Sequence, residues 1–398
     1  MSLLSFAERL AVMDRSAVTF LPERCLHKQD KGSACAACFQ ICPAQAITAG
    51  APPAYDPQKC QGCLACLPVC PTGAYSADDA VSELLTNATQ LGAAQLELVC
   101  SLHPQPNLGT SDRAKGLMVR GCLAGLGAGA GMALAAAGFE HIIYRCDACA
   151  GCPWGASHAQ IQSQVAEVQQ LLAPWGKSSV PVICDTLENP VKRLLWKAEN
   201  RSVSRRDFFR SAFQQAKVSA ERAHEKVEAA KPRLPGRDRA RKLKAASALG
   251  EPRDRAAALP RSDFAQMHAS SACTACGVCA RICPTQALAL VMDESKKRFN
   301  LVFYAQNCVN CGYCVRSCVP NALQMTGLPR FEHVFRTQKS VLLQAGELVR
   351  CERCNTLIAV QSETHLCPMC QFRQANPFGS KLPPGFQLPL AKKKKPSL

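Results

Sequence analysis

The sequence reads CTACGVCARICP over residues 273–284 and CVNCGYCVRSC over residues 308–318. In each run three cysteines stand three positions apart, and a fourth follows four positions later. Three thiolates at this spacing can hold three corners of an iron–sulfur cube, and the displaced fourth turns toward a neighbouring cube. The runs therefore predict two 4Fe-4S clusters that exchange their fourth ligands. The predicted sets are Cys273, Cys276, Cys279 and Cys318, and Cys283, Cys308, Cys311 and Cys314.

These runs resemble the cysteine motifs of the bacterial two-cluster ferredoxins. One difference is that Val319 stands where a proline usually follows the last cysteine, with Pro320 one position later. Without the proline the turn is less rigid, but the cysteine ligands keep their positions. The resemblance implies that residues 263–330 form a ferredoxin-like module that transfers electrons.

Residues 1–79 repeat the motif in altered form. The run CQGCLACLPVCP at 60–71 is regular, but in CAACFQICP at 35–43 an insertion at 26–34 pushes the first cysteine back to Cys25. His27 is an alternative iron ligand to Cys25, although a loop histidine near a site is usually only solvated. The predicted sets are Cys25, Cys35, Cys38 and Cys70, and Cys42, Cys60, Cys63 and Cys66.

A second repeat accompanies the four cysteine runs. Four and five positions after each closing cysteine come an alanine and an apolar residue. A small residue lets the backbone close over a cluster, and the apolar neighbour shields the cluster from water. The four copies predict two pseudo-symmetric modules of short helices and small hairpin strands. The pairs are Ala46-Ile47, Ala74-Tyr75, Ala287-Leu288 and Ala322-Leu323.

Residues 80–190 alternate between apolar runs that end in cysteine and helix-like stretches at 123–138 and 158–172. Such strand–helix alternation predicts a parallel sheet. The carboxyl ends of parallel strands share one edge, where ligand crevices form, so we expect these cysteines to converge. The runs end at Cys100, Cys122, Cys146 and Cys184.

The loop CDACAGCP at 146–153 adds two thiols, Cys149 and Cys152, to that of Cys146. Cys100, Cys122 or Cys184 could complete a fifth cluster from a neighbouring strand. The alternative is that strand-end cysteines are small buried hydrophobic residues. This segment, roughly a quarter of the chain, resembles the small iron–sulfur subunit of methyl-viologen-reducing hydrogenases. The resemblance implies electron delivery toward a heterodisulfide reductase.

The uncharged run at 121–139 has two other interpretations. Its GLGAGAG segment at 125–131 is similar to a dinucleotide-binding loop, but Ala130 takes the place of the third glycine and no acidic residue ends the next strand. The run is also long enough to enter a bilayer, yet it is built from Gly and Ala rather than Leu or Ile. We expect a crossover helix packed closely on the sheet.

Residues 191–262 carry 20 Lys or Arg against 8 Asp or Glu, which is +12 of the formal net charge of +17. With four prolines and few apolar residues, this stretch predicts a basic, partly helical linker without a core of its own. Its segment at 204–210 resembles a twin-arginine export motif, but the mid-chain position argues against export. A stripe of phenylalanines for docking a partner is the other interpretation, formed by Phe208, Phe209 and Phe213. We expect acidic redox partner proteins first and an anionic membrane surface second, and no nucleic acid.

Residues 331–375 contain two further cysteine pairs, CERC at 351–354 and CPMC at 367–370. Four thiolates in two such knuckles predict a zinc ribbon with ligands Cys351, Cys354, Cys367 and Cys370, and a rubredoxin-like single iron is the alternative. A module this small cannot fold on its core alone, so the metal supplies much of its stability. A basic tail follows at 376–398.

The 26 cysteines are fully assigned: sixteen to the two ferredoxin-like modules, six to the central segment and four to the ribbon. The first twenty residues lack a basic front end, and Glu8 and Arg9 interrupt their apolar residues, so we expect no signal peptide. Reduced thiols at this spacing indicate metals rather than disulfides. We expect a cytoplasmic location, with the inner face of the membrane as the alternative.

Together these features predict an α+β chain in which two ferredoxin-like modules flank a small α/β parallel-sheet domain, followed by the zinc ribbon. The expected function is that of a multi-cluster electron-transfer protein, the electron-conducting subunit of a larger oxidoreductase complex rather than an enzyme by itself. An enzyme with a catalytic cluster in the central segment is the alternative, and a cluster-sensing regulator is a weaker one. We predict no catalytic side chains.

Overall fold

The computed structural model describes residues 18–198, 235–259, 264–327, 329–335, 340–360 and 365–376. The export-like motif at 204–210, the phenylalanines after it and almost all of the basic tail lie outside these residues.

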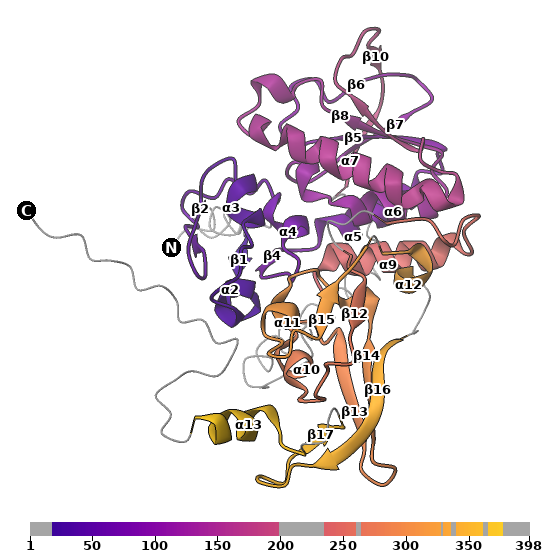
Figure 1. The fold of residues 1–398 in the computed structure, drawn as a ribbon. Coiled ribbons are helices and arrows are strands. Elements are labelled where there is room, and N and C mark those ends of the chain that lie inside the picture. Colours follow the sequence, from indigo (N-terminus) through magenta and orange to yellow (C-terminus); the bar gives the residue numbers. More distant parts are fainter. Residues whose placement is uncertain are drawn as a thin grey trace, which may run out of the picture.

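A five-stranded parallel sheet forms the centre of the upper domain in Figure 1. Its strand order is β11-β7-β5-β8-β9, and every neighbouring pair is parallel, which confirms the predicted parallel sheet. The edge strand β11 lies beyond residue 190, so the sheet includes residues that the sequence assigned to the linker. The strands are β5 (Gln95–Val99), β7 (Lys115–Met118), β8 (His141–Arg145), β9 (Pro181–Cys184) and β11 (Leu195–Lys197). A short antiparallel pair, β6 (Leu108–Gly109) and β10 (Val191–Lys192), lies beside it.

Helix α6 (Ala128–Ala136) packs against α5 (Ala80–Gln90), α7 (His158–Leu172) and α9 (Arg237–Leu249). Small residues allow this close approach, because a Cβ on Gly131 would lie 2.9 Å from Cγ2 of Val168 in α7 and 2.8 Å from the hydroxyl oxygen of Tyr144 in β8. The Gly- and Ala-rich run therefore forms a buried helix, as expected. Among the residues described, no helix combines the length and the apolar character that crossing a bilayer requires.

The N-terminus of α6 is already occupied by a carboxylate of the protein. The backbone N–H of Gly129 donates to Oδ1 of Asp238 over 2.7 Å. The free N–H groups of a helix start attract anions, and here a side chain of α9 takes the position that a pyrophosphate would need.

The first ferredoxin-like module is built from very short elements around its cysteine loops. Its two hairpin-like pairs are β1 with β4 and β2 with β3, both antiparallel. The insertion at 26–34 forms the short helix α2, so it adds a turn without displacing Cys25 from the module. The elements are β1 (Thr19–Phe20), η1 (Pro22–Arg24), α2 (Leu26–Gln29), α3 (Ala37–Ile41), β2 (Ile47–Thr48), β3 (Ala54–Tyr55), α4 (Cys66–Val69) and β4 (Tyr75–Ser76).

The second module shares its sheet with the segment that carries the last four cysteines. Strand β16 (Val341–Arg350) pairs with β14 along most of its length and then with β17 (Leu357–Ala359), giving the order β13-β14-β16-β17. The predicted ribbon is therefore attached to the second module by a continuous strand (Figure 1). The other elements are β12 (Met267–Ala269), α10 (Val278–Ile282), β13 (Leu288–Asp293), β14 (Arg298–Phe303), η6 (Ala305–Asn307), α11 (Tyr313–Arg316), β15 (Leu323–Met325), α12 (Phe331–Phe335) and α13 (Pro368–Ala375).

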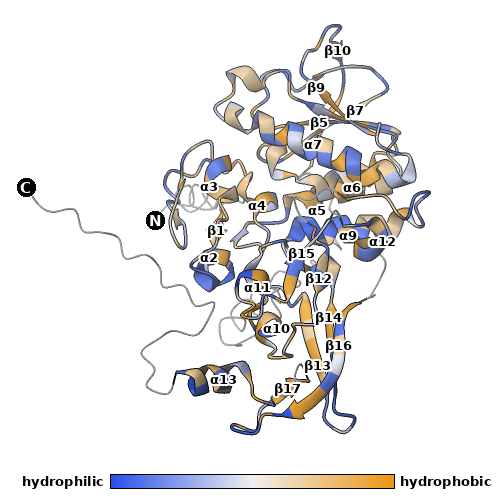
Figure 2. Cartoon of the chain, viewed as in Figure 1, coloured by the Kyte–Doolittle hydropathy of each residue, from blue (hydrophilic) through white to orange (hydrophobic). Residues whose placement is uncertain are grey.

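Helix α9 differs from the solvated linker that the charge of residues 191–262 predicts. Figure 2 shows it as strongly hydrophilic, yet it lies between α6 and the second module. The Lys242 side chain is only 2 % exposed and pairs with Glu167 at 2.7 Å and with Asp238 at 3.0 Å. Arg239 donates to the carbonyl oxygens of Ala305 and Gln306. The charges of Asp238, Arg239 and Lys242 are thus satisfied inside the protein, and through them α9 contacts α6, α7 and the second module.

Candidate iron–sulfur and metal sites

The first module gathers its eight cysteines into two groups of four. We call Cys25, Cys35, Cys38 and Cys70 site A, and Cys42, Cys60, Cys63 and Cys66 site B. The four thiols of site A line one small cavity, and those of site B are close enough that Cys63, Cys60 and Cys42 add to the effect of burial in raising the pKa of Cys66. Both groups match the sets that the spacing predicts.

His27 lies beside site A, but one of its ring nitrogens is already engaged. Its Nε2 is 2.6 Å from the carbonyl oxygen of Cys35. The thiol of Cys25 lines the same cavity as the other three thiols, and burial together with Cys70 and Cys35 raises its pKa. The geometry favours Cys25 over His27 as the fourth group of site A.

The second module also gathers its eight cysteines into two groups of four, in and around α10 and α11. Site C comprises Cys273, Cys276, Cys279 and Cys318, and site D comprises Cys283, Cys308, Cys311 and Cys314. Each group of four lines its own small cavity, walled otherwise by apolar residues such as Leu290 and Leu323 at site C and Phe303 and Met325 at site D. Four sulfur donors around one apolar cavity form a donor set that suits a 4Fe-4S cluster.

The alanine repeat has a structural explanation in these sites. The residue before each alanine has positive φ in all four runs: Gln45, Gly73, Gln286 and Asn321. This left-handed turn aims the alanine N–H at the closing cysteine, and the N–H groups of Ala74 and Ala287 lie 3.1 Å from the Sγ atoms of Cys70 and Cys283. Such N–H···S bonds stabilise a thiolate and tune the potential of a bound cluster. All four alanines are almost completely buried, which explains why a small residue stands at this position of each run.

Burial keeps most of these thiols protonated in the absence of iron. It raises the pKa of Cys38 to about 11 and that of Cys279 to about 12, and the neighbouring thiols of each set add to the shift. A thiolate is the metal ligand, so cluster binding at these sites must release protons. The positive charge of iron compensates for the burial and for the repulsion among four thiolates.

In the central domain five of the six cysteines come close together. Burial raises the pKa of Cys100 to about 11, with contributions from Cys152 and Cys149, and it raises that of Cys122 to about 12, with contributions from Cys100 and Cys149. A hydrogen bond from Cys146 lowers the pKa of Cys149 to about 7. These five thiols form what we call the central site.

Cys184 does not join the central site. Its Sγ donates to the carbonyl oxygen of Thr186 over 3.4 Å. Burial raises its pKa, and the charged groups that contribute to the shift are Arg145, Asp147 and Glu97. Of the three strand-end cysteines that could complete a fifth cluster, the geometry therefore favours Cys100 and Cys122.

Two further polar residues border the central site, and sequence reasoning missed both. A sulfur, nitrogen or oxygen atom of each of Cys146, His158 and Asp185 lies within 4.8 Å of the others, and His158 Nε2 is 2.8 Å from Asp185 Oδ1. Asp185 directly follows strand β9, so the rule that gathers the strand-end cysteines at one edge could have found it.

A buried charge network holds the start of the central loop, and it too was missed. Arg145 is 1 % exposed, and its Nε donates to Asp147 Oδ1 over 2.7 Å while its Nη1 lies 3.3 Å from Glu97 Oε2. Arg193 pairs with the same Glu97 oxygen at 2.6 Å. Because Asp147 follows Cys146 directly, these ion pairs fix the position of the loop that carries three of the central thiols.

The first module and the central site are joined by a backbone hydrogen bond between two cysteines. The N–H of Cys122 donates to the carbonyl oxygen of Cys63, in site B, over 3.1 Å. Gly121 and Gly125 permit this contact, since a Cβ on Gly125 would lie 2.8 Å from Cβ of Leu64. Nearby, Nε1 of Trp154 donates to Gln61 over 3.0 Å. Site B and the central site are therefore immediate neighbours.

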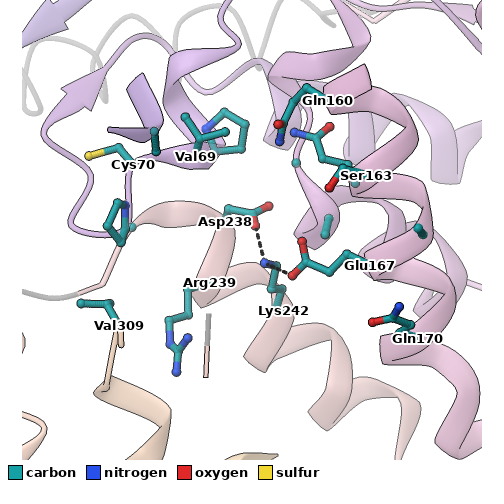
Figure 3. A pocket seen from close by; sticks show the side chains of 18 of the residues that line it. Val69, Cys70, Gln160, Ser163, Glu167, Gln170, Asp238, Arg239, Lys242 and Val309 are labelled. Atoms are coloured by element: carbon teal, nitrogen blue, oxygen red, sulfur yellow. Dashed lines mark hydrogen bonds and ion pairs between the residues drawn. The ribbon is translucent and has the colours of Figure 1, made fainter. Parts of the chain in front are cut away.

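Sites A and D approach each other across a cavity of about 530 Å³ (Figure 3). Cys35 and Cys70 of site A and Val309, next to Cys308 of site D, line it together with residues of α7 and α9. The ion pairs of Lys242 with Glu167 and Asp238 lie in its wall, as the dashed lines in Figure 3 show. No unpaired charge among these three side chains remains for a ligand.

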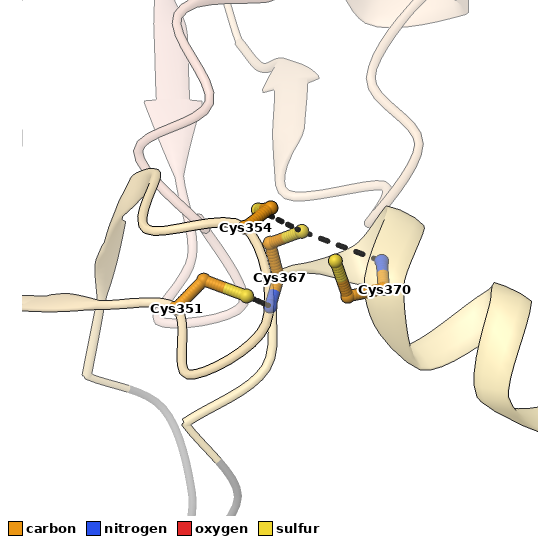
Figure 4. A group of neighbouring side chains, drawn as sticks. All are labelled: Cys351, Cys354, Cys367 and Cys370. Atoms are coloured by element: carbon orange, nitrogen blue, oxygen red, sulfur yellow. Dashed lines mark hydrogen bonds between the residues drawn. The ribbon is translucent and has the colours of Figure 1, made fainter.

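The last four cysteines form a separate four-cysteine site (Figure 4). Their sulfur atoms all lie within 4.8 Å of one another. The N–H of Cys367 donates to Sγ of Cys351 over 3.2 Å, and this bond is the largest of the effects that lower the pKa of Cys351 to about 6. A second such bond joins Cys370 to Cys367. Burial raises the pKa of Cys370 to about 12, so a bound metal must displace its proton. Four sulfur atoms this close together suit a tetrahedral metal, and the donor set fits zinc or a single iron.

Two segments of the chain match known protein families. Residues 53–76 match a 4Fe-4S binding domain, and residues 272–322 match a 4Fe-4S dicluster domain. No curated protein matches the chain. The matched segments contain the cysteine runs of site B and of sites C and D. The chain therefore carries two 4Fe-4S ferredoxin-type domains and a separate four-cysteine site, and it is an iron–sulfur electron-transfer protein.

Proposed function

We propose that this chain is the electron-conducting subunit of a larger redox complex and that it conducts electrons between the central site and the second ferredoxin-type domain. The observation that carries the proposal is the hydrogen bond between Cys122 and Cys63, which puts a thiol of the central site next to site B. When bound, 4Fe-4S clusters accept and release single electrons without bond chemistry on a substrate. The protein then has to hold the sites close together and keep water away.

The contacts between the two ferredoxin-type domains support a continuous path. Arg239 of α9 donates to the carbonyl oxygens of Ala305 and Gln306, just before Cys308 of site D. Gly236 caps the same end of α9, and its N–H donates to the carbonyl oxygen of Pro71, next to Cys70 of site A. In this proposal α9 fixes the separation of sites A and D.

The proposal includes four 4Fe-4S clusters, at sites A to D, and a fifth iron–sulfur cluster at the central site. It also assigns structural zinc to the four-cysteine site, because that site lies at the end of strand β16 and outside the proposed path from the central site to the second ferredoxin-type domain. The resemblance of the central segment to the small iron–sulfur subunit of methyl-viologen-reducing hydrogenases suggests such a complex. We expect it in the cytoplasm or at the inner face of the membrane, since all these sites need reduced thiols.

A second candidate function is an enzyme whose central site binds a substrate at an open iron position. The observation that favours it is the side-by-side placement of Cys146, His158 and Asp185, which offers a proton donor and acceptor beside the thiols. Substrate-induced changes in the spin resonance of a central cluster would support this candidate. Tight, salt-resistant DNA binding would instead support the weaker alternative of a regulator.

The main experiment is anaerobic purification, followed by iron, sulfide and zinc quantification and by spin resonance during reductive titration. We expect about sixteen irons from sites A to D, near twenty with a central cube, and one zinc. Eight or fewer irons after full reconstitution would contradict the two-domain assignment. Spin–spin broadening between the central signal and that of site B should report their contact, and a central signal that stays unbroadened on full reduction would contradict the proposed path.

A further inference from the structure

Arg281 and Arg316 occupy equivalent places in the two halves of the second ferredoxin-type domain. Each stands two positions after the third cysteine of its run, near the end of α10 or α11. Each guanidinium folds back over the glycine that follows the second cysteine: Nη1 lies 3.0 Å from the Cβ position of Gly277 for Arg281, and 2.8 Å from that of Gly312 for Arg316. The internal repeat therefore places one arginine beside site C and one beside site D.

Arg316 uses its position to join the two ferredoxin-type domains. Its Nη2 donates to the carbonyl oxygen of Cys311 over 3.2 Å and forms an ion pair with Asp30 of the first domain. Asp30 lies in the insertion at 26–34 and comes from the part of the chain that carries site A. At site D, a carboxylate of a neighbouring domain thus docks on the arginine beside the cluster loop.

Arg281 has no such partner within the part of the chain that the structure describes. It is exposed, and its guanidinium makes no ion pair or hydrogen bond with the described residues. It stands beside Cys276, which is exposed, whereas the cysteines of sites A, B and D are buried or half-buried. Val319, next to Cys318 of site C, is 51 % exposed, while its counterpart Pro284 in the other half is buried.

Site C is therefore the ferredoxin-type site that opens most directly to the surface. Its opening combines an exposed sulfur ligand, a small apolar residue and an unpaired cation. Electron-transfer partners meet through patches of this kind, in which an apolar centre near the redox group is surrounded by charge that steers the encounter. The formal net charge of +17 favours anionic partners in the same way.

We propose that Cys276, Arg281 and Val319 form the docking surface for an acidic electron-transfer protein, which places a carboxylate on Arg281 as Asp30 does on Arg316. This inference rests on the proposed electron-transfer function and names the site of exchange and the chemistry of the partner. Contact over Cys276 brings the partner's redox centre as near to site C as the fold allows. One electron passes between site C and the partner, whose centre is correspondingly reduced or oxidised.

The test uses the full-length, cluster-loaded protein and an acidic two-cluster ferredoxin as the probe. We expect Arg281→Glu to weaken binding, measured by calorimetry at low ionic strength, about five- to thirtyfold, because reversing one contact charge replaces an attraction with a repulsion. Salt should weaken the wild-type complex and have less effect on the variant. The matched control is Arg113→Glu, an exposed arginine in the loop before β7 that should change binding by less than about twofold.

A second readout places the contact directly. Arg281→Lys supplies an amine that a water-soluble carbodiimide couples to a partner carboxylate, forming an amide as the carbodiimide becomes its urea. Mass spectrometry should find this cross-link at position 281 of Arg281→Lys and no cross-link at position 113 of Arg113→Lys. Equal affinities of Arg281→Glu and the wild type, or cross-links confined to other surfaces, would overturn the docking surface. Normal cluster spectra in the variants would then leave the electron-transfer function intact, whereas loss of reducible clusters in the wild type would refute the function itself.

Discussion

Replacing Lys242 by methionine should loosen α9 from the central domain, whereas the same change at Lys244 should not. The two lysines stand on the same helix, and methionine preserves length and helix propensity in both. Lys242 is buried and bonded to Glu167 and Asp238, while Lys244 is exposed. The comparison therefore isolates the buried charge from the effect of removing a lysine.

The size of the effect follows from what the carboxylates lose. Breaking a buried ion pair by removing one partner costs about 3–5 kcal/mol. The Glu167 side chain is 18 % exposed and borders the cavity of Figure 3, so water can rehydrate it in part. Asp238 keeps its bond from the N–H of Gly129. We therefore expect a loss of about 2–4 kcal/mol, which is roughly a 30- to 900-fold shift in the local opening equilibrium.

Hydrogen exchange measured by mass spectrometry is the suitable assay, because a chain of several domains does not unfold in one two-state step. Amides of 237–249 and 128–136 should exchange faster in Lys242→Met by this factor. Adding Glu167→Gln should recover part of the loss, since it removes one uncompensated carboxylate.

Wild-type exchange rates in Lys242→Met would refute the reasoning, because they would mean that the buried ion pairs give α9 no net stability. Equal acceleration in Lys244→Met would also refute it. In that case the lysine side chains would act through helix propensity or net charge rather than through the contacts with Glu167 and Asp238.

Three other predictions concern the metal sites. Cys279→Ser should remove about four irons by chemical analysis and disturb the spin resonance of the neighbouring site D. Cys184→Ser should leave the iron content unchanged, because the Cys184 thiol is not part of the central site. Cys354→Ser should release the metal of the four-cysteine site and speed hydrogen exchange near 351–370 while the cluster absorbance stays; retention of the metal would contradict the site. Gly125→Ala should overpack the contact with Leu64 by about 1–3 kcal/mol and weaken magnetic coupling between site B and the central site. Gly151→Ala, where no atom lies within 4 Å of the added methyl, is the control, and equal coupling in both variants would show that the close contact is unimportant.

Much of the candidate site could be predicted because its information is local. A cluster takes three ligands from one short run, so the spacing of Cys273, Cys276 and Cys279 already limits which thiols can meet. The parallel sheet was predictable for a similar reason, since its strands are apolar runs separated by helices of ordinary length. The left-handed turns before Ala74 and Ala287 explain a repeat that the sequence displayed without its hydrogen bonds.

The contacts between modules could not be predicted, because they join residues far apart in the chain. Asp238 meets Gly129 across 109 positions, and Arg316 meets Asp30 across 286. The net charge of residues 191–262 predicts a solvated linker, because composition does not tell buried from exposed positions. Lys242 and Arg239 lie on the buried side of α9, where they pair with carboxylates and carbonyl oxygens. His158 and Asp185 likewise gain their meaning only from the edge of the sheet that they share.

The sequence by itself determined the chemistry of this protein, namely sulfur ligands at fixed spacings and the short elements that carry them. The tertiary structure alone decided the order of the sites: site B against the central site, site A facing site D, and site C open to the surface. The physical reason is that metal ligation is fixed by a few neighbouring residues, whereas the packing of modules depends on the burial and charge pairing of side chains that come together only when the chain is folded.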